Sequence, residues 1–398
     1  MRPPRSIPRL RPISRLRPIS RSRPIEQVRP VALVVAVALV VGASGCGEAI
    51  FVPGDLPGIM RVVAGIPDSP GATVDPRATA TQLNQPAGLV LADDGTLYIA
   101  DRENGRVLSV SSSGALAVVF TGVGCPREPC LSEPSGLALD GAGGLLITDV
   151  EPSQPPAANG PRVWRVDLAN GQGEVIAGTG VSGVAVPGTP ALQADLGEPD
   201  GIVVAPDGRI IFAERRNNRV LAIANNGTIR VIAGTGTLGF SGDGGPAVDA
   251  ELNFPAGLAL SGGVLYIADA GNDRVRAVNL GAGTITTVAG SGVRSFGGDN
   301  GPALGAAFNL PEDVSVSADG GTLYIADTGN HRVREVNLVT GTITTFAGTG
   351  DTEFNGDLRD AGDSSLARPR GVASSPGFDL LFVADTDHHI ARRTPTRF

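Results

Sequence analysis

The sequence predicts an all-β protein, a six-bladed β-propeller whose blades are four-stranded antiparallel sheets. Three observations lead to this fold class. Glycine and proline are abundant, with 56 and 31 residues among 398, which is typical of short strands joined by many turns. A β-rich unit that opens on a proline recurs six times, and the complete units each hold four short strand-like runs. Four strands per repeat at spacings of 48 to 65 residues are typical of propeller blades.

The strands of each repeat follow one pattern. A proline precedes the first apolar run, and these prolines are Pro86, Pro134, Pro199, Pro255, Pro311 and Pro369. After a glycine-containing turn, a second run ends in an acidic residue: Asp101, Asp149, Glu214, Asp269, Asp327 and Asp385. The third run begins after a tight turn, as in the Asn-Asp-Arg-Val of residues 272–275, and the fourth ends near Ala-Gly, as at residues 289–290.

The sixth repeat has only three of these strands after its proline. Its fourth strand is expected from the other end of the chain, because the IMRVVAG of residues 59–65 matches the fourth run of the third repeat, residues 228–234. This strand would close the ring and remove the free edges that invite aggregation. One propeller domain over residues 56–398 follows, preceded by a short tether at residues 46–55.

The repeats resemble the NHL repeat family. The matching elements are the Pro-x-Gly start, the Tyr-Ile-Ala-Asp strand end and the Asn-x-Arg-Val turn, and the segments FSGDGGPAVDAELNFP (240–255) and FGGDNGPALGAAFNLP (296–311) are similar to those of bacterial NHL proteins. The second repeat departs from the pattern by the insertion PSQPPAANG (152–160), and the sixth by its turn. The resemblance implies that ligands bind at the mouth of the central channel, on the face where the first strands begin.

Residues 1–45 have the composition of a basic leader with a signal peptide. An arginine- and proline-rich tract precedes the apolar run of residues 31–41, which is too short for a bilayer-spanning helix of about 20 residues. A basic region, a short apolar region and small residues are typical of secretion. The small residues before Cys46 resemble a bacterial lipobox, with Ala43 where leucine is usual, and this implies a lipidated Cys46. Plain secretion and a buried apolar segment are the alternatives.

The charge distribution favours a protein of the bacterial cell envelope, lipid-anchored or secreted. The leader holds nine arginines and one acid, so the rest of the chain carries 23 basic and 39 acidic residues. An acidic body is a poor partner for phosphates, which excludes nucleic acid. Contact with the membrane is expected through the lipid anchor alone, and the protein is expected to be a monomer.

Two further cysteines, Cys125 and Cys130, lie between prolines in GCPREPCL. In an oxidising compartment this arrangement favours a disulfide. Zinc is less favoured, because no histidine and no second cysteine pair lie nearby in the sequence.

The acids that end the second strands are expected to be structural. Each carboxylate can accept hydrogen bonds from turn amides and pair with the arginine that follows, which would be Arg106, Arg274 or Arg332. A catalytic centre is normally built once, whereas this pattern recurs around the ring. The acids assigned this role are Asp101, Asp149, Asp269, Asp327 and Asp385.

Candidate ligand-binding residues flank the prolines that open the first strands, because these positions differ from repeat to repeat. They are Glu133, Glu198, Asp200, Glu312, Arg368 and Arg370, together with Asp313, which replaces the usual glycine. The acids converging near two arginines could form a mouth for a polar ligand or for a divalent cation in the channel. The alternative is a solvated acidic rim that the arginines partly neutralise.

The leading functional hypothesis is a non-enzymatic module that binds a protein, peptide or glycan at the cell envelope, with no catalytic residue and no cofactor. The alternative is a metal-dependent gluconolactonase-like or lyase-type enzyme, and a purely structural role is a third. Zinc held by three histidines, as in amidating-lyase propellers, is disfavoured. Of the three histidines in the chain, His331 lies in a repeated turn, and His388 and His389 are expected to be adjacent on a strand, with side chains on opposite faces.

Overall fold

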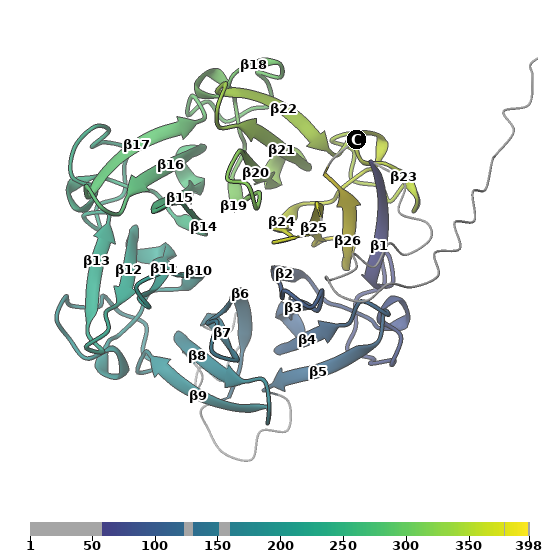
Figure 1. Cartoon of the computed structure of the whole chain (residues 1–398), viewed down its shortest axis with the longest axis horizontal. Helices are drawn as coiled ribbons and strands as arrows, with labels where there is room; N and C mark the ends of the chain where they lie inside the picture. The colour runs from purple at the N-terminus through teal and green to yellow at the C-terminus, as the bar shows by residue number, and fades with distance from the viewer. Residues whose placement is uncertain (1–57, 123–129, 151–159, 378, 397–398) are drawn as a thin grey trace, which may run out of the picture. The chain divides into compact units, whose positions relative to one another are not determined.

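The computed structural model describes residues 58–122, 130–150, 160–377 and 379–396. Over these residues the strands form six antiparallel sheets around a central channel, as Figure 1 shows. In four of the sheets the strands follow one another in sequence order from the channel outwards, and in the other two the outer edge is formed by strands from elsewhere in the chain. The predicted six-bladed β-propeller with four-stranded blades is confirmed.

Each blade begins with the strand that lines the channel and ends with the outermost one. Blade 1 has β2 (Pro86–Leu91), β3 (Leu97–Asp101), β4 (Arg106–Val110) and β5 (Leu116–Thr121), and blade 2 has β6 (Glu133–Leu139), β7 (Gly144–Val150), β8 (Arg162–Asp167) and β9 (Gln172–Ala177). Blade 3 has β10 (Pro199–Val204), β11 (Ile210–Glu214), β12 (Arg219–Ile223) and β13 (Ile229–Ala233), and blade 4 has β14 (Pro255–Ser261), β15 (Val264–Asp269), β16 (Arg274–Asn279) and β17 (Thr284–Ala289). Blade 5 has β19 (Pro311–Val316), β20 (Thr322–Asp327), β21 (Arg332–Asn337) and β22 (Thr342–Ala347), and blade 6 has β24 (Pro369–Ser374), β25 (Leu380–Asp385), β26 (Ile390–Pro395) and β1 (Ile59–Gly65).

Short elements join the strands. The two-residue strands β18 (Gly301–Pro302) and β23 (Arg359–Asp360) extend the outer edges of blades 5 and 6. Single 3₁₀ turns follow the second strands: η2 (Arg102–Asn104), η4 (Arg215–Asn217), η6 (Ala270–Asn272) and η8 (Thr328–Asn330). Others lie between blades: η1 (Ala78–Ala80), η3 (Ala191–Gln193), η5 (Ala247–Asp249), η7 (Ala303–Gly305) and η9 (Ala361–Asp363).

The hydrophobic core lies between neighbouring blades. In the cluster between blades 3 and 4, Ile211 and Val220 pack with Leu258 and Ile267 of the next sheet. Burial of each such side chain contributes about 1.5–3 kcal/mol, so every blade depends on both of its neighbours. We therefore expect the ring to be stable only when it is closed.

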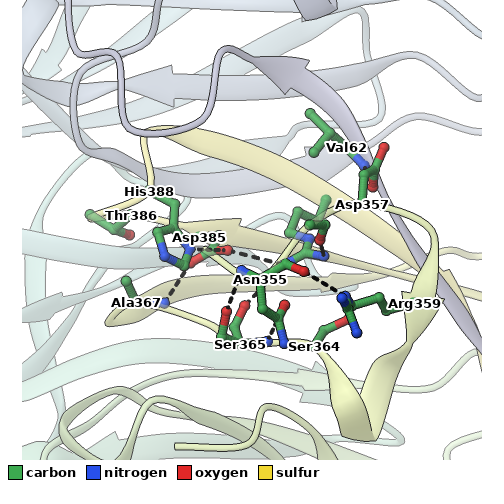
Figure 2. Close-up of polar contacts among 12 residues, drawn as sticks. Val62, Asn355, Asp357, Arg359, Ser364, Ser365, Ala367, Asp385, Thr386 and His388 are labelled. Carbon is green, nitrogen blue, oxygen red and sulfur yellow. Dashed lines mark hydrogen bonds and ion pairs between the residues drawn. The ribbon is translucent and has the colours of Figure 1, made fainter. Parts of the chain in front are cut away.

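Closure is achieved by β1, as predicted. It pairs antiparallel with β26, with Arg61 opposite Arg393 and Gly65 opposite Ile390. Beyond the ladder, the backbone N–H of Val62 donates to Asp357 Oδ1 at 2.7 Å, a contact labelled in Figure 2. The segment from the N-terminal end therefore holds the outermost place in a blade whose other main strands come from the C-terminal end.

Hydrogen bonds between neighbouring blades connect the channel-side ends of the sheets. The residue before β12, β16, β21 and β26 has a left-handed backbone, and in all four its side chain accepts a hydrogen bond from the backbone N–H just before the proline of the next blade. The accepting residues are Asn218, Asp273, His331 and His389, and the donors are Phe254, Leu310, Arg368 and Gln85. His389 thus links blade 6 to blade 1.

The two accepting histidines should make the ring sensitive to acid. Burial lowers the pKa of His331 and of His389 below 6.5, and each Nδ1 can accept its hydrogen bond only when unprotonated. A lowered histidine pKa means that the unfolded chain binds protons more readily, so the stabilisation is complete above pH 6.5 and is lost as the pH falls through the lower folded pKa. His331→Asn and His389→Asn keep an acceptor that the chain itself uses at Asn218.

Both proteins should lose unfolding free energy between pH 7.5 and pH 5. We expect the loss to be smaller in the double variant by about 1 kcal/mol for each replaced histidine, the contribution of about one hydrogen bond. Urea unfolding at the two pH values measures this. Because His388 is present in both proteins, its opposite contribution cancels in the comparison. Equal losses in the two proteins would contradict the prediction.

Several sequence expectations lie outside the described residues. These are the leader at residues 1–45, the tether at residues 46–55, the lipidation of Cys46, and Cys125, one half of the expected disulfide with Cys130. All of them stay predictions. Along the part of the chain that the structure describes, no helix has the length and apolar character needed to cross a bilayer.

Candidate functional site

The acids that end the second strands are buried and hold the turns around them. Asp101 accepts hydrogen bonds from the N–H of Asn84 at 2.7 Å, from Asn104 Nδ2 at 2.8 Å and from Arg106 Nε at 2.6 Å. The other blades repeat the arrangement with different donors. In Figure 2, Asp385 lies between Ala367, whose N–H donates at 2.7 Å, and His388, whose Nδ1 lies 2.8 Å from the carboxylate.

The arginine that pairs with this acid differs from the expected one in two blades. Asp101 pairs with Arg106 as expected, but Asp269 is contacted by Arg276 and Asp327 by Arg334, at 3.5 and 3.4 Å. The expected partners Arg274 and Arg332 lie on the same face of their strands, two residues earlier, and donate to backbone carbonyls. Where a second arginine stands two residues further along, that arginine contacts the acid, whereas in blade 1 this position is Leu108 and Arg106 makes the contact.

These buried arginines also fix the glycine-rich segments between blades. Arg276 Nη2 donates to Asp243 Oδ1 at 2.8 Å, and Arg334 Nη2 donates to Asp299 Oδ1 at 2.6 Å. In the same loops, the ring of Phe240 faces the guanidinium of Arg276 and the ring of Phe296 faces that of Arg334. Burial raises the pKa of Asp269 and of Asp327 to about 6 and that of Asp149 to about 7, although the hydrogen bonds to these carboxylates lower the pKa. These hydrogen bonds and ion pairs are all within the blades and loops, so the buried acids and arginines serve as parts of the scaffold.

The central channel is a cavity of about 800 Å³ lined by the innermost strands β2, β6, β10, β14, β19 and β24. Most of its lining is aliphatic residues and glycine, with one glycine each from β2, β6, β10 and β14. Four of the seven sequence-predicted ligand-binding residues line it: Asp200, Glu312, Asp313 and Arg370. Charge is therefore gathered where the first strands begin, at the mouth expected from the sequence.

These side chains form a connected ion-pair network, which we call the mouth network. Arg215 donates to Asp200 Oδ2 at 3.0 Å and to Glu312 Oε1 at 3.1 Å. Glu312 Oε2 in turn lies 2.6 Å from Arg370 Nε. The network runs from β10 through the turn after β11 to β19 and β24, so it joins three of the six blades.

Glu133 extends the network towards blade 1. Its Oε2 accepts from Arg102 Nη2 at 3.2 Å, and both side chains are largely buried. Arg102 also acts electrostatically on Asp200 and on Arg370, which places all these charges around one mouth. Three arginines (Arg102, Arg215 and Arg370) and three acids (Glu133, Asp200 and Glu312) make the network electrically balanced.

The arginines keep two of the network acids ionised despite their burial. Burial alone would raise the pKa of Asp200, but Arg215, the Ser135 hydroxyl and Arg370 hold it below its usual range. Burial is likewise overcome at Glu312, where Arg370 and Arg215 lower the pKa. Both carboxylates are anions at neutral pH and already have cationic partners.

Asp313 is the exception to this balance. It stands where the other blades have glycine, and its Oδ2 accepts from the N–H of Val372 in the next blade at 2.8 Å. Burial is the main cause that raises its pKa to about 8, and the nearby charges of Asp200 and Glu312 act in the same direction. This carboxyl is mostly protonated at pH 7.

Besides Glu133, which joins the network through Arg102, two predicted site residues lie outside the channel lining. Glu198 is half-buried and pairs with Arg216, and Arg368 is exposed and lies 3.8 Å from Asp387 Oδ2. Both have a left-handed backbone before their prolines, with φ of 55° and 49°. That turn directs the side chains away from the channel, whereas the residues that follow the prolines line it.

The structure adds Arg102 and Arg215, which sequence reasoning had not singled out. A signal for them exists in the sequence: both follow the acid that ends a second strand, where blades 4, 5 and 6 have Ala270, Thr328 and Thr386. Arginine at this position in only two blades breaks the repeat in the same way as Asp313 does.

The histidines do not converge. His388 contacts Asp385 and the carbonyl of Thr352, whereas His331 and His389 accept hydrogen bonds at two different blade junctions. The prediction that His388 and His389 lie on a strand is wrong: both lie in the turn before β26. Among the described residues, no group of three or more histidine, cysteine, aspartate or glutamate side chains is arranged to hold a metal ion.

Comparison with known protein families matches this chain to the NHL repeat, over residues 83–108 and 308–335. These segments cover the start and turn of blades 1 and 5. Human NHL repeat-containing protein 2 is 27% identical over 343 residues, which is 76% of this chain and 45% of that protein. The chloroplastic protein SUPPRESSOR OF QUENCHING 1 of Arabidopsis thaliana is 25% identical over 343 residues, 80% of this chain and 31% of that protein. The chain thus spans less than half the length of these curated relatives.

Solved structures share the fold at low sequence identity. An auxiliary nutrient binding protein from Bacteroides thetaiotaomicron superposes with a TM-score of 0.59 at 14% identity, covering 84% of this chain and 75% of the other. A gluconolactonase from Xanthomonas campestris superposes with a TM-score of 0.52 at 16% identity, covering 86% of this chain and 98% of the other. At such identities the likeness concerns the architecture alone.

Proposed function

We propose that this NHL-repeat propeller is a non-enzymatic binding module of the bacterial cell envelope, which holds a polar ligand at the mouth of its channel. The observation that carries the proposal is the mouth network, in which Asp200, Glu312 and Arg370 line the channel without repeating around the ring. Side chains that serve only the scaffold recur from blade to blade, whereas these occur once. Pockets that bind ligands commonly combine an apolar lining with a few convergent polar groups.

Binding fits the network better than hydrolysis does. Both oxygens of Asp200 and Oε1 of Glu312 already accept hydrogen bonds from Ser135 or Arg215, and Oε2 of Glu312 is ion-paired with Arg370. A metal would have to displace these arginines before it could use the carboxylates. The ligand class expected from the sequence, a protein, peptide or glycan, can instead use the polar mouth as it stands.

The test is capture by the purified full chain on arrays of glycans and of short peptides. Ligands captured by the original protein should be lost, by at least about tenfold in affinity, in Arg370→Gln, the loss expected for one charged hydrogen bond of about 1.5–3 kcal/mol. Glu198→Ala is the matched control, because its carboxylate lies outside the channel lining. Equal capture by all three proteins would place the binding site elsewhere.

A lipid anchor on Cys46 is part of the proposal. Mass spectrometry of the mature N-terminus identifies an acylated cysteine directly. Cys46→Ser should move the protein from the membrane fraction to the soluble fraction. A membrane-bound Cys46→Ser protein would contradict the anchor.

The alternative is a lactonase, and Asp313 is the group that favours it. A carboxyl with a pKa near 8 can hold a proton at neutral pH and release it, as a general acid must. Lactone hydrolysis that depends on Asp313 and on added Ca²⁺, Zn²⁺ or Mn²⁺ would replace the binding proposal. Elemental analysis of the purified protein tests the metal requirement separately.

A further inference from the structure

The mouth network has hydrogen-bond donors that no protein group uses. Three of its carboxylate oxygens accept hydrogen bonds: Asp200 Oδ1 from Ser135 at 2.5 Å, and Asp200 Oδ2 and Glu312 Oε1 from Arg215. Glu312 Oε2 lies 2.6 Å from Arg370 Nε in an ion pair, but accepts no hydrogen bond from the described residues. A ligand that brings hydrogen-bond acceptors therefore complements the unused donors of the network.

The unused donors belong above all to Arg370. Its guanidinium carries five N–H groups, yet within the described residues its one partner is Glu312, reached through Nε. The side chain is 18% exposed and lines the channel. Its two terminal NH₂ groups, the edge that binds carboxylates in pairs, are therefore left to the channel.

Asp313 lies on β19, the channel-lining strand next to β24, which carries Arg370. Its Oδ2 is held by the N–H of Val372, two residues along the strand from Arg370. Its Oδ1 extends towards blade 4, where a Cβ added to Gly257 would collide with it. Because blade 4 has glycine at this position, the Asp313 carboxyl fits in the channel between blades 4 and 6. Because it is mostly protonated at pH 7, it can donate an O–H.

We propose that the channel binds the carboxylate of a small organic acid, with the terminal NH₂ groups of Arg370 donating to both carboxylate oxygens and Asp313 donating its O–H to the same ligand. This rests on the proposed binding function and names its ligand class. The three arginines of the network balance its three acids, so the anion does not meet a mouth of net negative charge. The rest of the lining is mainly aliphatic residues and glycine, with Asp93 and four serines, and its apolar part suits the non-charged part of a small molecule.

Calorimetric titration of the full chain tests the ligand class with pairs of probes that differ in one group. Glucuronate is compared with glucose, and N-acetyl-alanyl-alanine with its C-terminal amide, at pH 7. We expect binding of at least one carboxylate and at least tenfold weaker binding of its neutral partner. The pair that binds distinguishes a sugar acid from a peptide end as the source of the carboxylate. Inorganic phosphate binding as tightly as the carboxylate would overturn the assignment.

Variants locate the site. Arg370→Gln should weaken carboxylate binding at least tenfold, whereas Arg368→Gln, at the exposed arginine two residues earlier, should leave it unchanged. The original protein should lose affinity between pH 7 and pH 9 as Asp313 ionises beside Asp200 and Glu312, and Asp313→Asn, which keeps a donor, should not. Circular dichroism and thermal unfolding verify that each variant is folded.

The outcomes separate this inference from the proposed function. Binding of glucose or of the peptide amide as tightly as of its carboxylate, still sensitive to Arg370→Gln, overturns the carboxylate assignment but keeps the channel as a binding site. Failure of all four probes to bind at millimolar concentration overturns the inference, while the array experiment decides the function. Carboxylate binding that Arg370→Gln leaves intact also overturns it.

Discussion

Deletion of residues 1–65 is expected to destroy the stability of the propeller. The deletion removes β1, and with it the fully buried Met60 and Ala64 and the ladder to β26. Loss of one buried methionine side chain alone costs about 2–5 kcal/mol, and proteins are stable by only about 5–15 kcal/mol. The exposed edge of β26 should also pair with other molecules. We expect urea unfolding at a much lower midpoint and oligomers in size-exclusion chromatography with light scattering.

The matched control is deletion of residues 1–57, which leaves β1 intact and should not change the unfolding midpoint. A point variant tests the same strand at full length. Gly65 has φ of 91°, and a Cβ there would collide with the carbonyl oxygen of His389, so Gly65→Val should separate β1 from β26. A monomeric protein with an unchanged midpoint after deletion of residues 1–65 would show that the ring does not depend on this strand.

Arg276→Met is expected to destabilise the propeller by about 3–5 kcal/mol, the cost of removing one partner from a buried ion pair. Arg276 is fully buried and contacts Asp269, Asp243 and the carbonyl of Ser241. Methionine fills similar space but leaves the buried Asp269 without its cation. Urea unfolding at pH 7.5 measures the loss.

Two further variants separate the charge from the packing. Arg276→Met with Asp269→Asn should recover part of the loss, because no uncompensated charge then remains buried. Arg274→Met is the matched neighbour: this arginine is only half-buried and donates to two backbone carbonyls, so its loss should cost about 1 kcal/mol. Equal effects of Arg274→Met and Arg276→Met would contradict the assignment of the buried pair.

The fold could be predicted because its determinants repeat along the chain. Six proline-led strands, the acids that end the second strands and the match between residues 59–65 and 228–234 define both the blades and the closing strand. Pairing of individual side chains was less accessible. The Asn-x-Arg-Val motif draws attention to Arg274, but Arg276 is the one that contacts Asp269, and it is also held by Asp243 of a loop whose position the sequence does not show.

The candidate site could be predicted only in part. Positions that follow the prolines were placed at the mouth, and Asp200, Glu312, Asp313 and Arg370 do lie there. The left-handed backbone of Glu198 and Arg368 before proline is not visible in the sequence, and it directs these two side chains elsewhere. Arg102 and Arg215 were missed because they belong to turns, and only the closed ring brings those turns to the channel.

The pairing of β1 with β26 also has a consequence for the order of events in folding. Arg61 meets Arg393, so this contact joins regions from opposite ends of the propeller sequence. Hairpins within blades 1 to 5 need only short loops, whereas closure must wait until the final strands have been synthesised. During translation β1 is a strand without a partner, and blade 6 is the last to be completed. Closure of the ring by pairing of β1 with β26 is therefore expected to be the slow final step of folding. Until then, β1 is the segment that most needs protection from aggregation.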